Sequence, residues 1–471
     1  MRLQRTLGLA GAILCLMGIA FLSGLGLRFV YSEVLPQAAP GLGDDRRFAS
    51  TRPRDPDLRP SMLFDEALKK LAIYYVGPLP SDRTGMAYGA IEGMLALLND
   101  PKTRLLSPRE WEAVREAAAG RFRGLGAWLT VRKVQPADRL TDRGIYVVSV
   151  LPGSAAEKAG LRSGDRITTL DGKWIIDRHY SVREMLMLHD GLSGFSPPRE
   201  GRPNDEQIER SRREAEELRH KLLNHVELGQ AMITLMAEEG EHELTVARAG
   251  SAEPIKVRAT FGPVEARPLE QRKLNAQTGY LRLTVLHPAA AKAVEDALAA
   301  FAREGVRHLV IDLRQSPGGS LDVAVRIASA MIPSGVVVAM KERDANRNEV
   351  IRPRRVRENA VKLRPTSVVV LVDGGTAGAS EVLAAALRDQ LGARLLGAKT
   401  FGDGTAEEIV ELENGAAVSI TRGAMLTPKA NAAFNGRGLT PDAPAPDGEA
   451  AIQAALRALQ SPGRATPRRS G

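Results

Sequence analysis

The chain has 471 residues, enough for two or three domains with hydrophobic cores, and its hydrophobic content of 44% is ordinary for a globular protein. The net charge of +9 is spread along the sequence without a nucleic-acid-binding motif, so we interpret it as a solvated basic surface and expect no nucleic-acid partner. The 7 histidines are scattered, and there is neither an HExxH motif nor a cysteine pair, which argues against the common zinc sites. We therefore expect no metal and no other cofactor.

The N-terminus predicts a transmembrane anchor over residues 1–30. Arg2 and Arg5 precede an uncharged apolar run from Thr6 to Leu27. As a helix this run would measure about 33 Å, enough to cross a hydrocarbon core of about 30 Å. The run is longer than a signal-peptide core and no small-x-small cleavage site follows it, which favours an uncleaved anchor over a signal peptide. We expect a single-pass protein of the inner (cytoplasmic) membrane, with its body in the periplasm or outside the cell. The only cysteine, Cys15, lies within the run, so an exported body would have no disulfide.

A linker and a helical unit are expected next. Residues 31–61 are rich in proline and charge without an apolar period, which predicts a flexible linker. Residues 62–120 predict a unit of three helices. The first covers Leu63 to Tyr74, the second covers Ala87 to Leu98, and the third is capped by Ser107 with Pro108 as its first helical residue.

Residues 121–263 resemble a PDZ domain. The resemblance rests on the loop Gly124-Leu125-Gly126-Ala127 and on the stretch PGSAAEKAGLRSGDRITTLDG, which runs from Pro152 to Gly172. It implies that backbone N–H groups of Gly124, Leu125, Gly126 and Ala127 hold the carboxylate at the C-terminus of a polypeptide, which adds to the sheet as a strand. The open alternative is a PDZ domain that only packs against its neighbours.

A helical insertion interrupts this domain at about residues 191–240. Within it, Asn204 to Gly229 reads as one helix, with a capping box formed by Asn204 and Gln207 and with Gly229 as its C-cap. Its thin apolar stripe fits a helix docked on the surface, and it also fits a helix that binds a partner or a second copy of the chain. A third possibility is that this helix covers the peptide groove.

Residues 264–447 predict an α/β core. Helical patterns at 289–303, 321–331 and 381–387 alternate with the buried strand patterns HLVIDL (308–313) and SVVVLV (367–372), which indicates crossover connections. Residues 448–471 predict a C-terminal helix and a basic tail.

Four motifs of this core resemble the S41 family of C-terminal processing serine peptidases. They are DLRQSPGG (312–319), GGTAGASE (374–381), TFGDGT (400–405) and NGRGLTPD (435–442). The usual family pattern is DLRxNPGG, SASASE, FGKG and GxGxxPD. The fold class implied is an S41 peptidase-like α/β core with an inserted, β-rich PDZ domain and an N-terminal helical unit, after one transmembrane helix.

The resemblance also implies the site and its loss. The family nucleophile, the middle serine of SASASE, aligns with Gly378, and the general-base lysine of FGKG aligns with Asp403. Asp389 aligns with an acidic residue of some family members. An Asp389 close to Asp403 would raise the pKa of one carboxyl group, and the sequence leaves their distance open. Oxyanion-hole donors would come from Gly318, Gly319 and Ala379.

We therefore expect a pseudopeptidase that has kept polypeptide binding. The alternative is an active serine-type endopeptidase with a relocated nucleophile such as Ser380, although a shift of two residues rotates a side chain by about 200° around a helix. A third interpretation is a structural envelope scaffold that uses the inserted helix. The partners expected are polypeptide C-termini or envelope proteins, the membrane through the N-terminal helix, and either an active peptidase relative or a second copy through residues 204–229.

Overall fold

The computed structural model describes residues 60–77, 79, 83–134, 143–177, 213, 216, 220, 221, 223–358 and 360–460. The predicted anchor and basic tail lie outside these residues, as do nearly all of the predicted linker and most of the predicted helix 204–229. None of the helices in the described ranges is both long and apolar enough to cross a membrane. The chain divides into two compact units, Met1–Arg83 and Thr84–Gly471.

The three predicted N-terminal helices are present, but they do not form one body. They are α4 (Pro60–Tyr74), α5 (Thr84–Ala96) and α6 (Pro108–Ala118). The Ser107 hydroxyl accepts a hydrogen bond from the Glu110 N–H at 3.3 Å, so the predicted cap of the third helix is confirmed. The prediction of a single helical unit over 62–120 is wrong, because α4 belongs to the first compact unit and α5 and α6 to the second.

A seven-stranded sheet forms the PDZ-like part of the second unit. Its strands are β3 (Ala127–Lys133), β4 (Arg143–Val150), β5 (Arg166–Leu170), β6 (Lys173–Ile176), β7 (His225–Glu227), β8 (Gly240–Ala247) and β9 (Ile255–Phe261). The short helix α7 (Ala155–Lys158) and the helix α10 (Leu228–Ala237) share its hydrophobic core. The chain enters this domain through β2 (Arg121–Phe122) and leaves it through β10 (Val264–Glu265), and the two strands pair with each other.

The C-terminal part of the predicted insertion belongs to this domain. Residues 225–227 form β7, and α10 begins at Leu228, so Gly229 lies in the first turn of a new helix and is not the C-cap of the predicted one. Leu228, Met232 and Leu235 are buried in the domain core. Burial of this apolar face determines where α10 lies. The predicted helix therefore does not extend to Gly229, and the predicted insertion does not extend to residue 240.

The core domain is built on a five-stranded sheet in the order β11-β12-β13-β16-β17. The strands are β11 (Glu270–Asn275), β12 (Thr278–Arg282), β13 (His308–Asp312), β16 (Ser367–Val372) and β17 (Arg394–Gly397), and only β11 is antiparallel to its neighbour. The helices are α11 (Pro288–Arg303), α12 (Leu321–Ser329), α13 (Gly378–Leu391) and α14 (Glu449–Gln460), which confirms the predicted helices of the core and the C-terminal helix.

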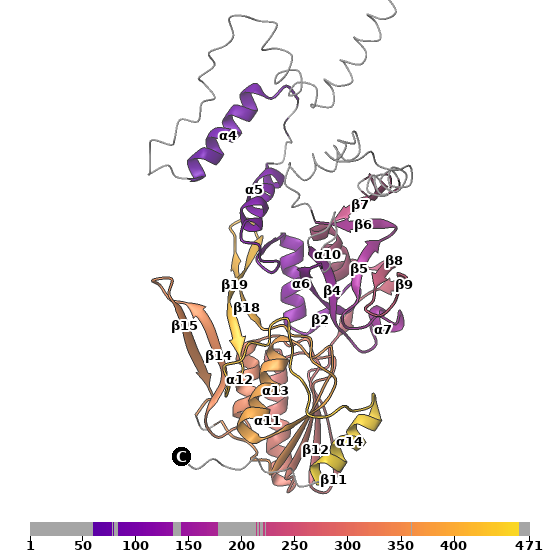
Figure 1. Ribbon diagram of the computed structural model, residues 1–471, viewed down its shortest axis with the longest axis vertical. Coiled ribbons are helices and arrows are strands. Elements are labelled where there is room, and N and C mark those ends of the chain that lie inside the picture. The colour runs from indigo at the N-terminus through magenta and orange to yellow at the C-terminus, as the bar shows by residue number, and fades with distance from the viewer. Residues whose placement is uncertain are drawn as a thin grey trace, which may run out of the picture. The chain divides into compact units, whose positions relative to one another are not determined.

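Both faces of this sheet are covered (Figure 1). Leu309 and Ile311 of β13 pack with α11, α12 and α13 on one face, whereas Val310 packs with α14 on the other. This alternation follows from the strand period of two residues and explains the continuous apolar run that predicted a buried strand.

A second sheet of the core, which the sequence did not predict, has the order β1-β19-β14-β15, with β18 paired to β19. Its strands are β1 (Arg104–Leu106), β14 (Val336–Arg343), β15 (Glu349–Arg355), β18 (Thr405–Glu411) and β19 (Ala417–Leu426). Because β1 pairs with β19, the turn between α5 and β1 is fixed beside the core.

Candidate functional site

The S41-like motifs converge at one edge of the parallel sheet. The segments that follow β13, β16 and β17 meet there, as expected for carboxyl ends of parallel strands. The Ala377 N–H donates to the Ser316 carbonyl at 2.9 Å, and the Phe401 N–H donates to the Thr376 carbonyl at 2.9 Å. The structure therefore brings together the segments of Gly318, Gly378 and Asp403.

Gly378 is the first residue of α13 and has a left-handed backbone, with φ +53°. A Cβ atom added there would meet only the Pro317 carbonyl oxygen, at 3.4 Å, within a 4 Å radius. The position thus has space for a side chain but provides no functional group. The left-handed backbone would cost a serine about 1–2 kcal/mol.

The oxyanion-hole-like residues lie close to Gly378. A Cβ at Gly318 would lie 2.7 Å from the Ala379 nitrogen, and a Cβ at Gly319 would lie 2.6 Å from the Leu286 carbonyl oxygen, so both positions require glycine. Within the described ranges, the N–H groups of Gly319 and Ala379 donate to no acceptor. Backbone donors of the kind that stabilise an oxyanion are therefore present beside a position that has no nucleophile.

Asp403 is neutralised by a lysine from a distant part of the chain. Its carboxylate contacts the Lys102 ammonium, which also donates to the Thr405 hydroxyl at 2.8 Å and lies 3.1 Å from the Glu407 carboxylate. The side chains of Lys102 and Asp403 are only 15% and 16% exposed. Burial alone would favour the neutral amine, but Asp403 and Glu407 outweigh it and raise the pKa of Lys102. The two carboxylates therefore favour the protonated, cationic form of Lys102.

Glu381 joins α13 to the segment of Asp403. Its fully buried carboxylate accepts N–H donors from Gly378 at 3.0 Å, Gly402 at 2.9 Å and Asp403 at 2.8 Å, and it accepts the Thr400 hydroxyl. Burial raises the pKa of Glu381 to about 7, although these hydrogen bonds favour the charged form and oppose the shift. The carboxylate is saturated with internal donors, so it holds the two segments together.

Asp389 does not take part in this cluster. It lies eleven residues beyond Gly378 on α13, which is about 16 Å along the helix axis. Its carboxylate accepts the Lys429 N–H at 3.1 Å and lies 3.4 Å from the Arg388 guanidinium. The contacts of Asp403 are instead with Lys102 and, through its N–H, with Glu381.

Neighbouring hydroxyl groups are occupied by other interactions. Ser380, considered above as a relocated nucleophile, is fully buried and shares a hydrogen bond of 2.7 Å with Ser316. Thr376 is also buried and donates to the Leu313 carbonyl at 2.7 Å. The Thr405 hydroxyl accepts a hydrogen bond from the Lys102 ammonium at 2.8 Å and donates one to the Glu407 carboxylate at 2.7 Å. Each of the three hydroxyls is therefore engaged in hydrogen bonds within the protein.

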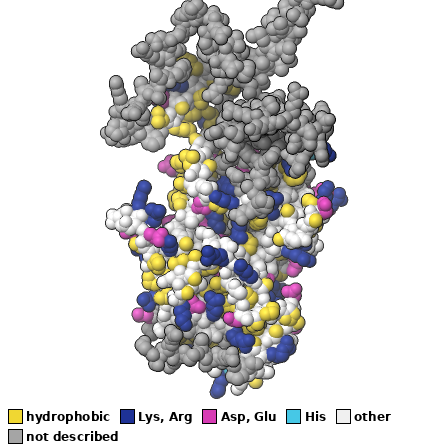
Figure 2. Space-filling view, viewed as in Figure 1, with side chains coloured by type: hydrophobic (Ala, Val, Ile, Leu, Met, Phe, Trp, Pro, Cys, Tyr) yellow, Lys and Arg dark blue, Asp and Glu magenta, His cyan; other side chains and the backbone are white. Residues whose placement is uncertain are grey.

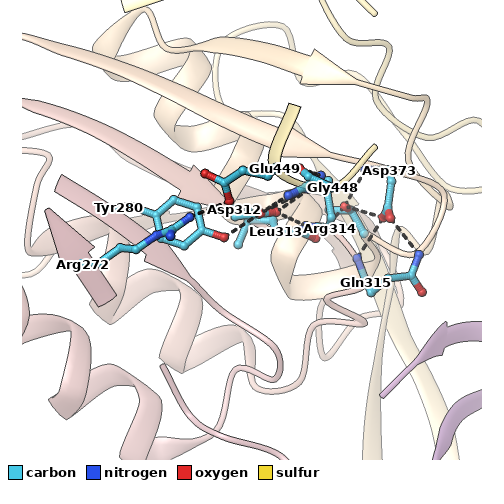
Figure 3. Close-up of polar contacts among 10 residues, drawn as sticks. Arg272, Tyr280, Asp312, Leu313, Arg314, Gln315, Asp373, Gly448 and Glu449 are labelled. Carbon is cyan, nitrogen blue, oxygen red and sulfur yellow. Dashed lines mark hydrogen bonds and ion pairs between the residues drawn. The ribbon is translucent and has the colours of Figure 1, made fainter. Parts of the chain in front are cut away.

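A buried polar network fixes the loop that precedes Gly318 (Figure 3). The Tyr280 hydroxyl and the Arg314 guanidinium donate to the Asp312 carboxylate, at 2.9 Å and 2.5 Å. Gln315, with φ +54°, donates through its amide to Asp373 at 2.7 Å and accepts the Val150 N–H of the PDZ-like domain at 3.1 Å. The network thereby links the loops after β13 and β16 to the end of β4.

The predicted peptide-binding loop is folded, but part of it is already used. The Leu125 N–H donates to the Leu235 carbonyl at 2.8 Å, and Gly124 and Gly126 have positive φ values of +69° and +70°. The space between β3 and α10 is a cavity of only about 100 Å³, and α6 closes its third side. Residues from these three elements line it: Ala113, Val114, Ala117, Ala127, Trp128, Leu129, Met232 and Met236. Side chains of α6 therefore share the space beside β3 in which a peptide strand would add.

Comparisons with known proteins identify the family. The model of peptidase family S41 matches residues 277–445, and a PDZ domain model matches residues 146–191. The chain is 30% identical over 373 residues to the chloroplastic C-terminal processing peptidase of Tetradesmus obliquus, covering 79% of this chain and 71% of that protein. This chain belongs to the S41 peptidase family.

Further similarities agree with this assignment. This S41 family member is 29% identical to a carboxyl-terminal-processing protease of Synechocystis sp., over 73% of this chain and 67% of that protein. Among solved structures, the photosystem II D1 C-terminal processing protease matches with a TM-score of 0.57 and 26% identity, over 83% of this chain and 91% of the other. The mixed α/β fold with a PDZ domain is therefore that of C-terminal processing peptidases.

Two residues of the site were not found from the sequence. Lys102 lies 301 positions before Asp403, and its only signal is a lysine in the turn DPKT, where the family pattern has a DPHS-like turn. Glu381 could have been found as the acidic residue three positions into a helix that begins at Gly378, where carboxylates accept the first free N–H groups.

Proposed function

We propose that this S41 family member is a pseudopeptidase, which binds polypeptides without hydrolysing them. The observation that carries the proposal is the pair of residues at the nucleophile and general-base positions. Gly378 has no side chain, and Asp403 is held in an ion pair by Lys102, whose pKa is raised. Acyl transfer requires a nucleophile and a base able to take its proton, and these two positions supply neither.

Retained binding features support the second half of the proposal. The PDZ domain suggests binding of polypeptide C-termini. The donors of Gly319 and Ala379 and the space at Gly378 are compatible with an extended chain at the core site. Since α6 lines the groove beside β3, we further propose that binding at the PDZ domain requires displacement of α6.

We also propose that the N-terminal segment anchors the protein in the membrane. The apolar run from Thr6 to Leu27, preceded by Arg2 and Arg5, supports a single-pass protein of the inner membrane with its body on the far side. In that location the protein would bind envelope polypeptides or an active peptidase relative.

The test is a comparison of binding and cleavage by the full-length protein in detergent. Fluorescent unfolded casein should bind, as measured by anisotropy, and remain intact on a gel after prolonged incubation. Release of casein fragments by the wild-type protein would refute the proposal, and failure of any unfolded polypeptide to bind would favour a structural scaffold instead.

A further inference from the structure

A cleft of about 530 Å³ lies next to the candidate site. It is bounded by the DPKT turn, by β3 and β4 of the PDZ domain, and by the core, and its lining comprises Asp100, Pro101, Lys102, Val131, Arg132, Lys133, Tyr146, Thr405, Asn435 and Gly436. This volume is typical of ligand-binding pockets. Its position between two domains, beside Lys102 and Thr405, makes it a candidate subsite for a polypeptide bound at the core.

Arg132 is the distinctive residue of the cleft. Its guanidinium lies 3.7 Å from the centre of the Phe401 ring and donates to the Gly402 carbonyl at 3.0 Å. In the described part of the chain, no carboxylate lies within 4 Å of it. Other arginines with little exposure are paired: Arg104 with Glu110, Arg143 with Asp177, and Arg314 with Asp312.

A partly buried arginine without a carboxylate partner is unusual, because removing a charge from water is costly unless an opposite charge compensates it. Burial lowers the pKa of Arg132, against the more distant attraction of Asp403 and Glu381. The guanidinium has five N–H donors, of which one is used in the contact with Gly402. The remaining donors form a planar fork of the kind that binds a carboxylate through two hydrogen bonds.

The residues that line the cleft carry three cations, Lys102, Arg132 and Lys133, and one carboxylate, that of Asp100. Lys102 is paired with two carboxylates, those of Asp403 and Glu407, which lie behind the lining. Asp100 accepts the Thr103 hydroxyl at 2.7 Å and the Lys102 N–H at 3.1 Å. Lys133 is exposed and forms no ion pair with a described residue. Burial raises the pKa of Tyr146, so its phenol stays protonated near neutral pH and can donate.

We propose that this cleft binds carboxylate groups of a polypeptide, with Arg132 as a bidentate anchor and Lys133 as a second cation. The inference rests on the proposed polypeptide binding and names the chemistry that is recognised. Because Asp403, Glu407 and Glu381 offset much of the positive charge near Arg132, a singly charged carboxylate fits the cleft better than a phosphate dianion. The carboxylate comes either from an acidic side chain or from the chain terminus.

Four synthetic peptides distinguish these sources. They are fluorescent dodecapeptides of alanine and leucine that carry an amidated C-terminus, a free C-terminus, two internal glutamates with an amidated C-terminus, or both features. Binding to the full-length protein in neutral detergent is measured by anisotropy at low salt and at about 0.5 M salt. We expect at least one carboxylate-bearing peptide to bind about tenfold or more tightly than the neutral peptide, with a smaller difference at high salt.

Variants assign the effect to the cleft. Arg132→Gln should abolish the preference for carboxylate peptides, Arg132→Lys should keep part of it, and Lys133→Gln should reduce it a few-fold. Arg258→Gln is the matched control, because Arg258 lies in β9 of the same domain and is 84% exposed. Thermal melting of each variant checks its fold, and Arg132→Lys decides the matter if Arg132→Gln does not fold.

The outcomes separate this inference from the proposed function. A preference for internal glutamates that is lost in Arg132→Gln assigns the cleft to acidic side chains, and a preference for the free terminus lost in the same variant assigns it to C-termini. Equal binding of all four peptides, or a preference that survives in both Arg132 variants, would overturn the inference while polypeptide binding stands. Binding of none of them by the wild type would overturn both.

Discussion

Replacement of Lys102 by methionine should destabilise the protein because it leaves Asp403 in a poorly solvated place without its cation. The two side chains are 15% and 16% exposed, and Glu407 lies on the other side of the same ammonium. Removal of one partner from a buried ion pair costs about 3–5 kcal/mol, and the residual exposure places Lys102→Met at the lower end, about 3 kcal/mol. An exposed pair is worth less than about 1 kcal/mol, so Lys292→Met, which breaks a pair with Asp296 at 65% and 62% exposure, is the control.

The free energy of unfolding is measured in urea through the fluorescence of the 3 tryptophans, whose positions range from Trp111 to Trp174. The double variant Lys102→Met, Asp403→Leu should be at least about 2 kcal/mol more stable than the sum of the two single effects predicts, because it removes both charges together. A cost below about 0.5 kcal/mol for Lys102→Met, equal to that of the control, would show that the ion pair does not hold the DPKT turn to the core.

Three further predictions concern acidity, location and peptide binding. The pKa of Glu381 is raised from 4.5 to about 7, so between these pH values the folded state binds a proton that the unfolded state has lost. The free energy of unfolding should therefore fall by about 3 kcal/mol as the pH rises from 4.5 to 7. Urea titrations at each pH should show a flatter slope for Glu381→Gln, and an unchanged slope would contradict this prediction. A periplasm-active reporter fused after Pro60 should be active, whereas recovery of the full-length body in the soluble cytoplasmic fraction would exclude the anchor. A peptide bound at the PDZ domain should lose at least about 1.5 kcal/mol of binding free energy when its C-terminus is amidated. It should bind more tightly to Val114→Asp, because this substitution weakens the packing of α6 against the groove. Equal calorimetric affinities in all these cases would mean that the PDZ domain only packs against its neighbours.

Much of the fold could be predicted because local patterns matched tertiary demands. The run SVVVLV became β16, buried on both faces, and Ser107 capped α6 as its sequence indicated. In the second sheet of the core, the run VVVAM of β14 has the same apolar character and could have been predicted, whereas β15 and β1 lack such a pattern. The edge strand β15 reads EVIRPRR and is almost entirely exposed, and β1 has only three residues. Pairing over long sequence separations supplies what these strands lack in local preference.

The site was predicted only in its outline. Motif order was enough to expect Gly318, Gly378 and Asp403 in adjacent loops, because each motif follows a buried parallel strand. The acidic pair of Asp389 and Asp403 did not form, since the length of α13 separates them. The partner of Asp403 came instead from Lys102, and no pattern in the sequence links residues 301 positions apart.

We propose that this protein binds polypeptides without cutting them. The decisive experiment is incubation of the full-length protein with unfolded casein and, in parallel, with a serine-directed fluorophosphonate probe. We expect no casein fragments and no covalent labelling for the wild type, and none for Gly378→Ser alone, because Asp403 paired with Lys102 supplies no neutral amine. Casein cleavage by the wild type that is lost in Ser380→Ala or Thr405→Ala would contradict the proposal.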